Sequence, residues 1–253
     1  MARPSLWIRP VFISPRKSAA VFTRAISQYG RSQLMKASHY RDWGKLELSR
    51  LGIHPAAFPA RPFRENPAPF EIVSIGRLSP EKGQHVLVLA LEQLLRQGRD
   101  MRLRFLGDGP DRRELEQHLA ALGIGDRVVF EGAFLHDRLA ELCRQADVCA
   151  LTSFLEGIPL VLMEAMAMEI PCIAPRITGI PELIHDGVDG ILFAPSDYLE
   201  IAGAVAQLMD DPALRRRLGQ AARQTVLAHY DAARNGRAFA ACLQGRLNPS
   251  GFH

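Results

Sequence analysis

The sequence predicts an α/β fold in which helices flank a parallel sheet. From residue 69 onward, short β-rich runs alternate with segments of helical periodicity, which is typical of parallel strands joined by crossover helices. The chain has 253 residues, 47% of them hydrophobic, enough for one well-packed domain plus a fragment. After Pro195 the pattern becomes wholly helical.

Six segments are predicted to form one sheet. Each is rich in apolar or β-branched residues and ends at glycine, proline or serine. In chain order they are FEIVSIG (70–76), MRLRFLG (101–107), RVVFEG (127–132), DVCALTS (147–153), PCIAP (171–175) and GILFAP (190–195).

Helical segments follow these strands. Their boundaries are given by glycine caps and by prolines that suit a first turn. They cover residues 83–98, 110–123, 137–146, 159–168 and a short 181–187, and then 197–211, 212–230 and 231–247, which we expect to pack over the sheet edge.

Upstream of the sheet, the pattern indicates a strand, a helix with Ser27 as N-cap, and a second strand in GKLELSRLG. Residues 1–51 are too few for an independent domain, and we expect their start to be disordered. Five prolines in 52–69 mark a linker. The predicted organisation continues with a ligand-binding domain over 70–230 and a C-terminal helix over 231–253.

The charge and the cysteine content of the chain narrow the range of functions that the protein can have. Lys and Arg number 31 against 27 Asp and Glu, a net charge of +4 that fits an anionic small molecule or an acidic membrane surface and does not demand nucleic acid. The four cysteines show neither zinc-site spacing nor a disulfide framework, which indicates a reducing compartment. Neither a transmembrane helix nor a signal peptide is expected, so we predict a cytoplasmic protein with peripheral contact at the inner face of the membrane.

Candidate ligand residues follow the strands, because ligands of open parallel sheets bind beyond the carboxyl ends of the strands. The loop GRLSPEKG (76–83) carries Arg77 and Lys82 beside a helix start at Gly83, which suits a diphosphate. A solvated turn is the alternative explanation of this loop.

Two carboxylates bound the apolar run after the fourth predicted strand. Glu156 precedes the helix start and Glu164 lies within the helix, where a charge is hard to bury without a partner. Hydroxyl groups of a sugar or ribose would be suitable partners. Alternatively, Glu156 is an ordinary cap and Glu164 lies on the polar face of an amphipathic helix.

Two further loops are less informative. LGDGP (106–110) is interpreted as a tight turn, because its glycines form only part of a nucleotide-binding pattern. RITGIPELI (176–184) places Glu182 in a first helical turn after Gly179, which fits a helix N-terminus as well as a ligand site.

Taken together, GRLSPEKG, LGDGP, EGIPLVLMEAMA and GIPELIHDGVDGILF resemble the donor-binding half of the retaining glycosyltransferases of family 4 (group 1). The resemblance covers residues 70–230 and implies the C-terminal domain of a GT-B fold, in which two Rossmann-like domains face each other across a cleft. Residues 1–51 would then be a remnant of the N-terminal acceptor domain, most of which would lie outside this chain.

The resemblance also implies site roles. Arg77 and Lys82, with Gly83, would hold the donor diphosphate; Glu156 would bind the transferred sugar as the catalytic-site acid, and Glu164 would bind the donor ribose. The backbone from Phe130 to Gly132 would lie by the base. Residues Gly157, Ile158 and Leu160 would line the phosphate and ribose side.

Two positions depart from the family pattern, which usually has glycine where Glu169 and Thr178 stand here. No D-x-D motif occurs, so neither a metal nor a cofactor is expected. Cations and a helix dipole would stabilise the leaving diphosphate instead.

The implied function is a hexosyltransferase-type glycosyltransferase. It would use a nucleotide-diphosphate sugar and a saccharide or lipid-linked acceptor in envelope or exopolysaccharide synthesis, with retention, and with a separate N-terminal half as a potential partner. Two alternatives remain open: a truncated, catalytically inactive donor-binding module, and a nucleotide-sugar epimerase of the same fold.

Overall fold

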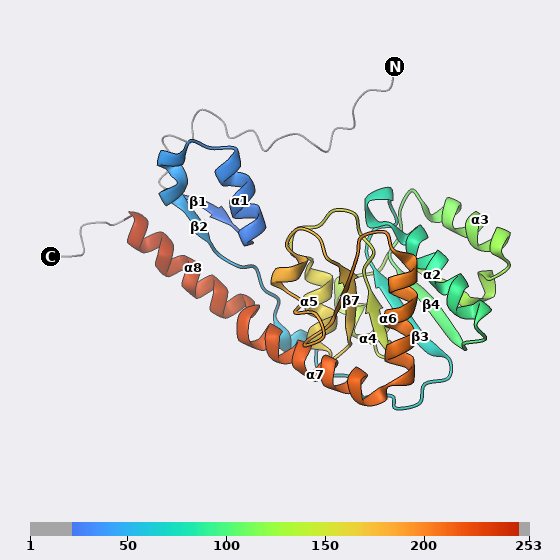
Figure 1. Ribbon diagram of the computed structural model, residues 1–253. Coiled ribbons are helices and arrows are strands. Elements are labelled where there is room, and N and C mark those ends of the chain that lie inside the picture. The colour runs from blue at the N-terminus through green and yellow to red at the C-terminus, as the bar shows by residue number, and fades with distance from the viewer. Residues whose placement is uncertain (1–21, 248–253) are drawn as a thin grey trace, which may run out of the picture.

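The computed structural model describes residues 22–247, and a six-stranded parallel sheet forms their main body (Figure 1). All six predicted strands are confirmed, and their spatial order is β5-β4-β3-β6-β7-β8. Their bounds are β3 Phe70–Ile75, β4 Met101–Leu106, β5 Val128–Gly132, β6 Val148–Ala150, β7 Cys172–Pro175 and β8 Ile191–Phe193.

The strand order reverses between β3 and β6. The strands β3, β4 and β5 extend the sheet in one direction, and β6, β7 and β8 extend it in the other. The loops after β3 and β6 therefore leave the carboxyl edge at the topological switch point, which is where ligands of open α/β sheets bind.

Helices cover both faces at the centre of this sheet, so β3, β6 and β7 are buried along their whole length, whereas β4 and β5 have exposed or charged residues on one face. Successive residues of β3 alternate between two apolar clusters: Ile72 packs with α2, α3 and α6, whereas Val73 packs with α4, α5 and α7. The helix bounds are α2 Gln84–Arg96, α3 Arg112–Leu122, α4 Leu139–Leu142, α5 Leu160–Ala167, α6 Tyr198–Asp210 and α7 Pro212–His229.

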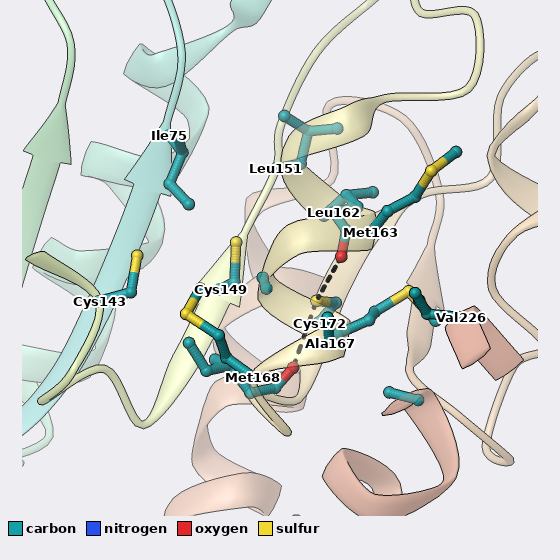
Figure 2. Packing of buried hydrophobic residues seen from close by; sticks show 14 of the residues in the cluster. Ile75, Cys143, Cys149, Leu151, Leu162, Met163, Ala167, Met168, Cys172 and Val226 are labelled. Atoms are coloured by element: carbon teal, nitrogen blue, oxygen red, sulfur yellow. Dashed lines mark hydrogen bonds between the residues drawn. The ribbon is translucent and has the colours of Figure 1, made fainter. Parts of the chain in front are cut away.

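The α5 side of the core contains three buried free cysteines, Cys143, Cys149 and Cys172. Figure 2 shows Cys172 beneath α5, where its Sγ lies 3.4 Å from the carbonyl oxygen of Ile170. Burial raises the pKa of the Cys143 thiol. These cysteines pack as small hydrophobic residues, with no access for a metal or an oxidant.

Three helical predictions are wrong in part. The short helix expected over 181–187 is a 3-10 turn, Ile180–Glu182, because the chain turns at His185, whose N–H donates to Asp189 Oδ1 at 2.6 Å. The helix expected over 137–146 is a 3-10 turn, His136–Arg138, followed by the short α4, because beyond Leu142 the peptides form tighter turns, as from Ala146 N to Cys143 O at 3.0 Å. The last helix, α8 (Ala232–Leu247), was expected over the sheet edge. Instead, α8 leaves the sheet and lies along the N-terminal unit, residues 22–51 (Figure 1).

The N-terminal unit, residues 22–51, has the predicted strand, helix and strand. The Ser27 Oγ accepts a hydrogen bond from Gly30 N at 2.9 Å, which confirms its N-cap role. The unit contains the parallel pair β1 (Thr23–Ala25) and β2 (Leu46–Leu48), with α1 (Gln28–Lys36) between them in sequence. The ring of Phe239 on α8 packs against Phe22, which explains why α8 lies here.

The proline-rich segment 52–69 has one short 3-10 helix, Pro55–Ala57, and is tied to the sheet body at both ends. Ile53 N donates to Tyr230 O at 2.9 Å. The buried guanidinium of Arg215 donates to the carbonyl oxygens of Arg64 and Glu65, each at 2.7 Å. The predicted disordered start falls outside the described residues, and the predicted domain limits stay predictions.

Candidate functional site

The loops after β3 and β6 contact each other at the switch point. Phe154 N donates to Glu81 O at 2.9 Å, and Thr152 Oγ1 donates to Lys82 O at 3.1 Å. A Cβ placed on Gly83 would lie 2.4 Å from Thr152 O, so only glycine permits this approach. The sequence-predicted cation loop and the loop of Glu156 are therefore parts of one site.

Lys82 and Glu156 meet at the centre of this site. Lys82 Nζ lies 2.6 Å from Glu156 Oε1, and Ser153 Oγ donates to the same oxygen at 2.6 Å. Only 25% of the Lys82 side chain and 10% of the Glu156 side chain are exposed. A cation and a carboxylate in this partly buried position can bind an anion and hydroxyl groups next to each other.

Arg77 lies on the same loop, and its side chain is exposed. Within residues 22–247 its guanidinium forms no salt bridge with a carboxylate, and its carbonyl oxygen accepts a hydrogen bond from Gln84 Nε2 at 2.8 Å. The side chain is therefore not held in one position by the protein. Its predicted contact with a diphosphate stays a prediction.

The LGDGP segment braces the cation loop, which the interpretation as a simple tight turn missed. Gly76 N donates to Leu106 O, Leu78 N to Asp108 O and Asp111 N to Leu78 O, at 3.0–3.2 Å. A Cβ on Gly109 would lie 2.1 Å from Leu78 O. The two backbones thus pack directly on each other, and the glycines of this loop serve that contact.

Glu164 is buried on α5 with 2% exposure, so its alternative assignment to a polar helix face is wrong. Its Oε1 lies 3.3 Å from His136 Nε2, whereas its Oε2 has no hydrogen-bond partner. Burial raises the pKa of Glu164, and the neighbouring His136 acts in the opposite direction.

Glu164 and Leu160 line a cavity of about 400 Å³ beside the linker. The other lining residues are Gly52, Ile53, His54, Ala57, Phe58, His136 and Asp137. Sequence reasoning missed His136 and Ser153. His136 could have been found, because it follows β5 at the same edge of the sheet; Ser153 follows β6 in the same way.

Four other predicted residues can offer mainly their backbone to a ligand. The Phe130 ring packs on Phe105, with 5.3 Å between ring centroids, and the Ile158 side chain is buried in the core. Gly132 pairs with Gly107 in an isolated bridge. Gly157 lies close to Ile26 of the N-terminal unit, since a Cβ placed on it would be 3.8 Å from Ile26 Cδ1.

The two positions that depart from the family's glycines both have left-handed backbone, with φ of 59° at Glu169 and 47° at Thr178. Thr178 Oγ1 donates to Glu156 O at 2.6 Å, so this threonine buttresses the candidate site. Glu182 lies in the first turn of a 3-10 helix, Ile180–Glu182, after Gly179, as predicted, but its side chain reaches another helix. It accepts hydrogen bonds from Gln28 N at 2.7 Å and Tyr29 N at 2.8 Å, at the first turn of α1.

The described residues contain no group of three or more His, Cys, Asp or Glu side chains that could hold a metal ion. Among residues 22–247, no helix is both long and apolar enough to cross a bilayer.

A family model described as glycosyl transferases group 1 matches residues 60–225. An alpha-D-kanosaminyltransferase of Streptomyces kanamyceticus is 35% identical over 63% of this chain and 41% of its own length. The putative colanic acid biosynthesis glycosyltransferase WcaL of Escherichia coli is 35% identical over 72% of this chain and 46% of its own length. The chain thus spans about half, or less, of the curated relatives it matches.

Solved structures support the fold. Anabaena Alr3699/HepE in complex with UDP superposes with a TM-score of 0.82 at 24% identity, covering 91% of this chain and 65% of that one. The C-terminal domain of a group 1 glycosyl transferase from Francisella tularensis, LpcC, gives a TM-score of 0.64 at 26% identity, covering 71% of this chain and 98% of that one. These neighbours confirm the predicted α/β class.

Proposed function

The chain belongs to the glycosyl transferases group 1 family, and from this membership we propose that it transfers a sugar from a nucleotide-diphosphate sugar to a saccharide or lipid-linked acceptor. We assign it to the retaining members of family 4, acting in envelope or exopolysaccharide synthesis. The observation that carries the proposal is the contact of Lys82 with Glu156 at the switch point.

Each side chain has a role in this proposal. Lys82, with Arg77, binds the diphosphate, and Glu156 accepts hydrogen bonds from the transferred sugar. In the free protein Lys82 and Glu156 neutralise each other, so neither charge is buried unpaired. Donor binding gives each of them a new partner, with the cations stabilising the negative charge that develops on the leaving diphosphate.

The nucleotide part extends from this pair toward Glu164. Leu160 begins α5, follows Glu156 closely in sequence and also lines the cavity of Glu164. The two parts of the site therefore lie along one continuous segment of the chain. The Glu164 carboxylate accepts a hydrogen bond from a ribose hydroxyl. The Anabaena neighbour is a complex with UDP, which supports a nucleotide donor for this fold.

We place the protein in the cytoplasm, with peripheral contact at the inner face of the membrane. The net charge of +4 supports attraction to an anionic surface. The second candidate function is a donor-binding module that needs another polypeptide for transfer. It is supported by the described site, in which Lys82, Glu156 and Glu164 are all assigned to the donor.

The test is titration calorimetry with a panel of UDP-, GDP- and ADP-sugars. Lys82→Met and Arg77→Ala are expected to weaken the best donor about 10- to 100-fold each, the range for a hydrogen bond to a charged group. Arg96→Ala is the control, because within residues 22–247 this exposed arginine forms a salt bridge with Glu92 on α2 alone. Unchanged affinity in both variants would exclude the diphosphate role.

Product analysis separates the functions that share donor binding. A transferase forms a glycoside only when an acceptor is added, whereas a binding module leaves the donor intact. Conversion of the donor sugar without an acceptor would indicate an epimerase.

A further inference from the structure

The cavity beside the linker contains a carboxylic acid, Glu164, that has a polar contact at one of its two oxygens within the described residues. Glu164 has 3% of its side chain exposed and receives one contact, from His136 Nε2 to Oε1 at 3.3 Å. The other oxygen, Oε2, is buried without a partner. Leaving a buried polar group unpaired costs about 1–3 kcal/mol, so such a group in a native site indicates that a ligand completes it.

We propose that His136 is a positioning residue that holds Oε1 of Glu164, so that Oε2 is presented to a hydroxyl group of the bound nucleotide. The inference rests on the proposed function, because it assigns a residue to the nucleotide end of that site. His136 acts through Glu164 and contributes no group to the transfer step.

The geometry around His136 supports this role. The imidazole packs edge-on against Phe58 of the linker, with 5.8 Å between ring centroids and 71° between ring planes. Phe58 is itself 5% exposed. With 70% of its side chain exposed, His136 meets the protein body through Phe58 and Glu164, and these two contacts set the direction in which it faces the carboxylate.

His136 also favours the ionised form of Glu164, although burial, the larger effect, favours the protonated form. Burial raises the pKa of Glu164, and His136 opposes that effect. The other titratable groups around Glu164 are Asp137 and His54, which line the cavity, and the buried Cys143 and Cys149. From α7, Arg223 donates to Ala167 O at the far end of α5 and to Phe58 O.

A comparison of two ligands, each titrated into the wild type and into variants, tests the proposal. Calorimetry with UDP, GDP and ADP first identifies the ribonucleoside diphosphate that the wild type binds most tightly. That compound and its 2′,3′-dideoxy analogue are then titrated into the wild type and variants. The wild type is expected to prefer the ribose form about 10- to 100-fold, since the lost hydrogen bond is to a charged group.

In His136→Ala this preference is expected to fall to about three-fold or less, because Oε1 and Oε2 are no longer held. His136→Gln supplies an amide donor and is expected to recover most of the preference at neutral pH. His118→Gln is the matched control: His118 on α3 contacts His85 and is not among the residues that line this cavity, so the preference ratio of this variant should match the wild type.

The pH profile adds a measurement that a purely structural role would not change. Binding of the ribonucleoside diphosphate should weaken as the pH falls and Glu164 becomes protonated. In His136→Gln this loss should begin at higher pH, since His136 lowers the pKa of Glu164 and an amide does not.

The outcomes separate the two proposals. If no nucleoside diphosphate binds the folded wild type, the proposed function fails and the role of His136 fails with it. If nucleotides bind but His136→Ala keeps the wild-type hydroxyl preference, or if His118→Gln loses it equally, only the role of His136 is overturned.

Discussion

Glu169 ends α5 in a conformation that glycine adopts without strain. Its φ is 59°, and it lies just past the helix end, with Glu169 N bonded to Met166 O and Ile170 N to Ala165 O, each at 3.1 Å. This is the hydrogen-bond pattern of a Schellman motif, whose left-handed position is usually glycine. A glutamate at this position therefore stores strain at the C-terminal end of α5.

Glu169→Gly is expected to raise the free energy of unfolding by about 1 kcal/mol, because the left-handed conformation costs a residue with a Cβ roughly 1–2 kcal/mol and the extra chain entropy of glycine offsets part of that gain. Urea denaturation followed by circular dichroism measures the change. Thr178→Gly is the comparison: its φ is 47°, but the substitution also removes the 2.6 Å hydrogen bond to Glu156 O, so a smaller gain is expected. A destabilised Glu169→Gly would contradict the assignment of strain.

Glu164 illustrates a conflict between stability and binding. Its folded pKa is raised by burial, so the folded state holds the proton more tightly than the unfolded state does. The contribution of Glu164 to the free energy of unfolding is therefore greatest below the pKa that it has in the unfolded chain. It is lost as the pH rises through the pKa that Glu164 has in the folded protein.

Glu164→Gln removes this loss, so at neutral pH the variant should unfold at the same urea concentration as the wild type or at a higher one. The difference between the two proteins should shrink as the pH falls toward 4.5, the ordinary pKa of a glutamate. Nucleotide affinity should nevertheless weaken about 10-fold or more, because a carboxylate acceptor is replaced by an amide. A variant that is less stable at neutral pH would show that the buried charge is fully compensated.

At the scale of elements, the candidate site depends on two loops that support each other. The loop after β3 carries Lys82, and the LGDGP segment after β4 packs on it through three backbone hydrogen bonds. The closest approach is at Gly109, where a Cβ would lie 2.1 Å from Leu78 O and 2.8 Å from Leu78 N. Backbone cannot move aside as a flexible side chain can, so this contact constrains residue 109 to glycine.

Gly109→Ala is expected to destabilise the protein by about 2 kcal/mol or more and to weaken donor binding, because the loop that carries Lys82 must shift. Gly125→Ala is the matched control, since a Cβ there meets nothing within 4 Å. Chemical denaturation of both variants and calorimetry with the best donor provide the comparison. Equal stability of the two variants would show that the loops are not mechanically linked.

The sequence predicted the strands because each is a short apolar run whose burial is decided locally. It could also indicate Lys82 and Glu156, since both follow strands that end at one sheet edge. It could not separate the turns after Leu142 from a helix, because the apolar spacing is the same in both. Nor could it predict the loop-to-loop contact at Gly109, which depends on two segments meeting in space.

At the scale of the whole molecule, the N-terminal unit is joined to the sheet body by contacts between residues distant in sequence. Ile53 O accepts a hydrogen bond from Ala232 N at 2.8 Å, and α8 runs from that point along the unit (Figure 1). Ile26 lies beside Gly157 in the loop of the candidate site. The placement of the unit relative to the sheet therefore affects one wall of that site. No sequence pattern within either part reveals this arrangement.

Glu182 makes the most specific of these connections. Both of its carboxylate oxygens accept peptide N–H groups in the first turn of α1, from Gln28 and Tyr29. A negative charge at a helix N-terminus also interacts favourably with the helix dipole. The capping group of α1 is thus supplied partly by its own Ser27 and partly by a residue of the sheet body.

Glu182→Ala should therefore loosen α1 without unfolding the sheet. The expected loss is about 1 kcal/mol, typical of a removed helix cap, and it should be concentrated in the N-terminal unit. Hydrogen exchange followed by mass spectrometry should show faster exchange in Gln28–Lys36 and unchanged protection of β3 and β4. Glu116→Ala controls for the removal of an exposed carboxylate, because Glu116 pairs only with Arg112 on α3. If α1 exchanges at the wild-type rate in Glu182→Ala, the helix is held by packing alone and the carboxylate does not couple the two parts of the molecule.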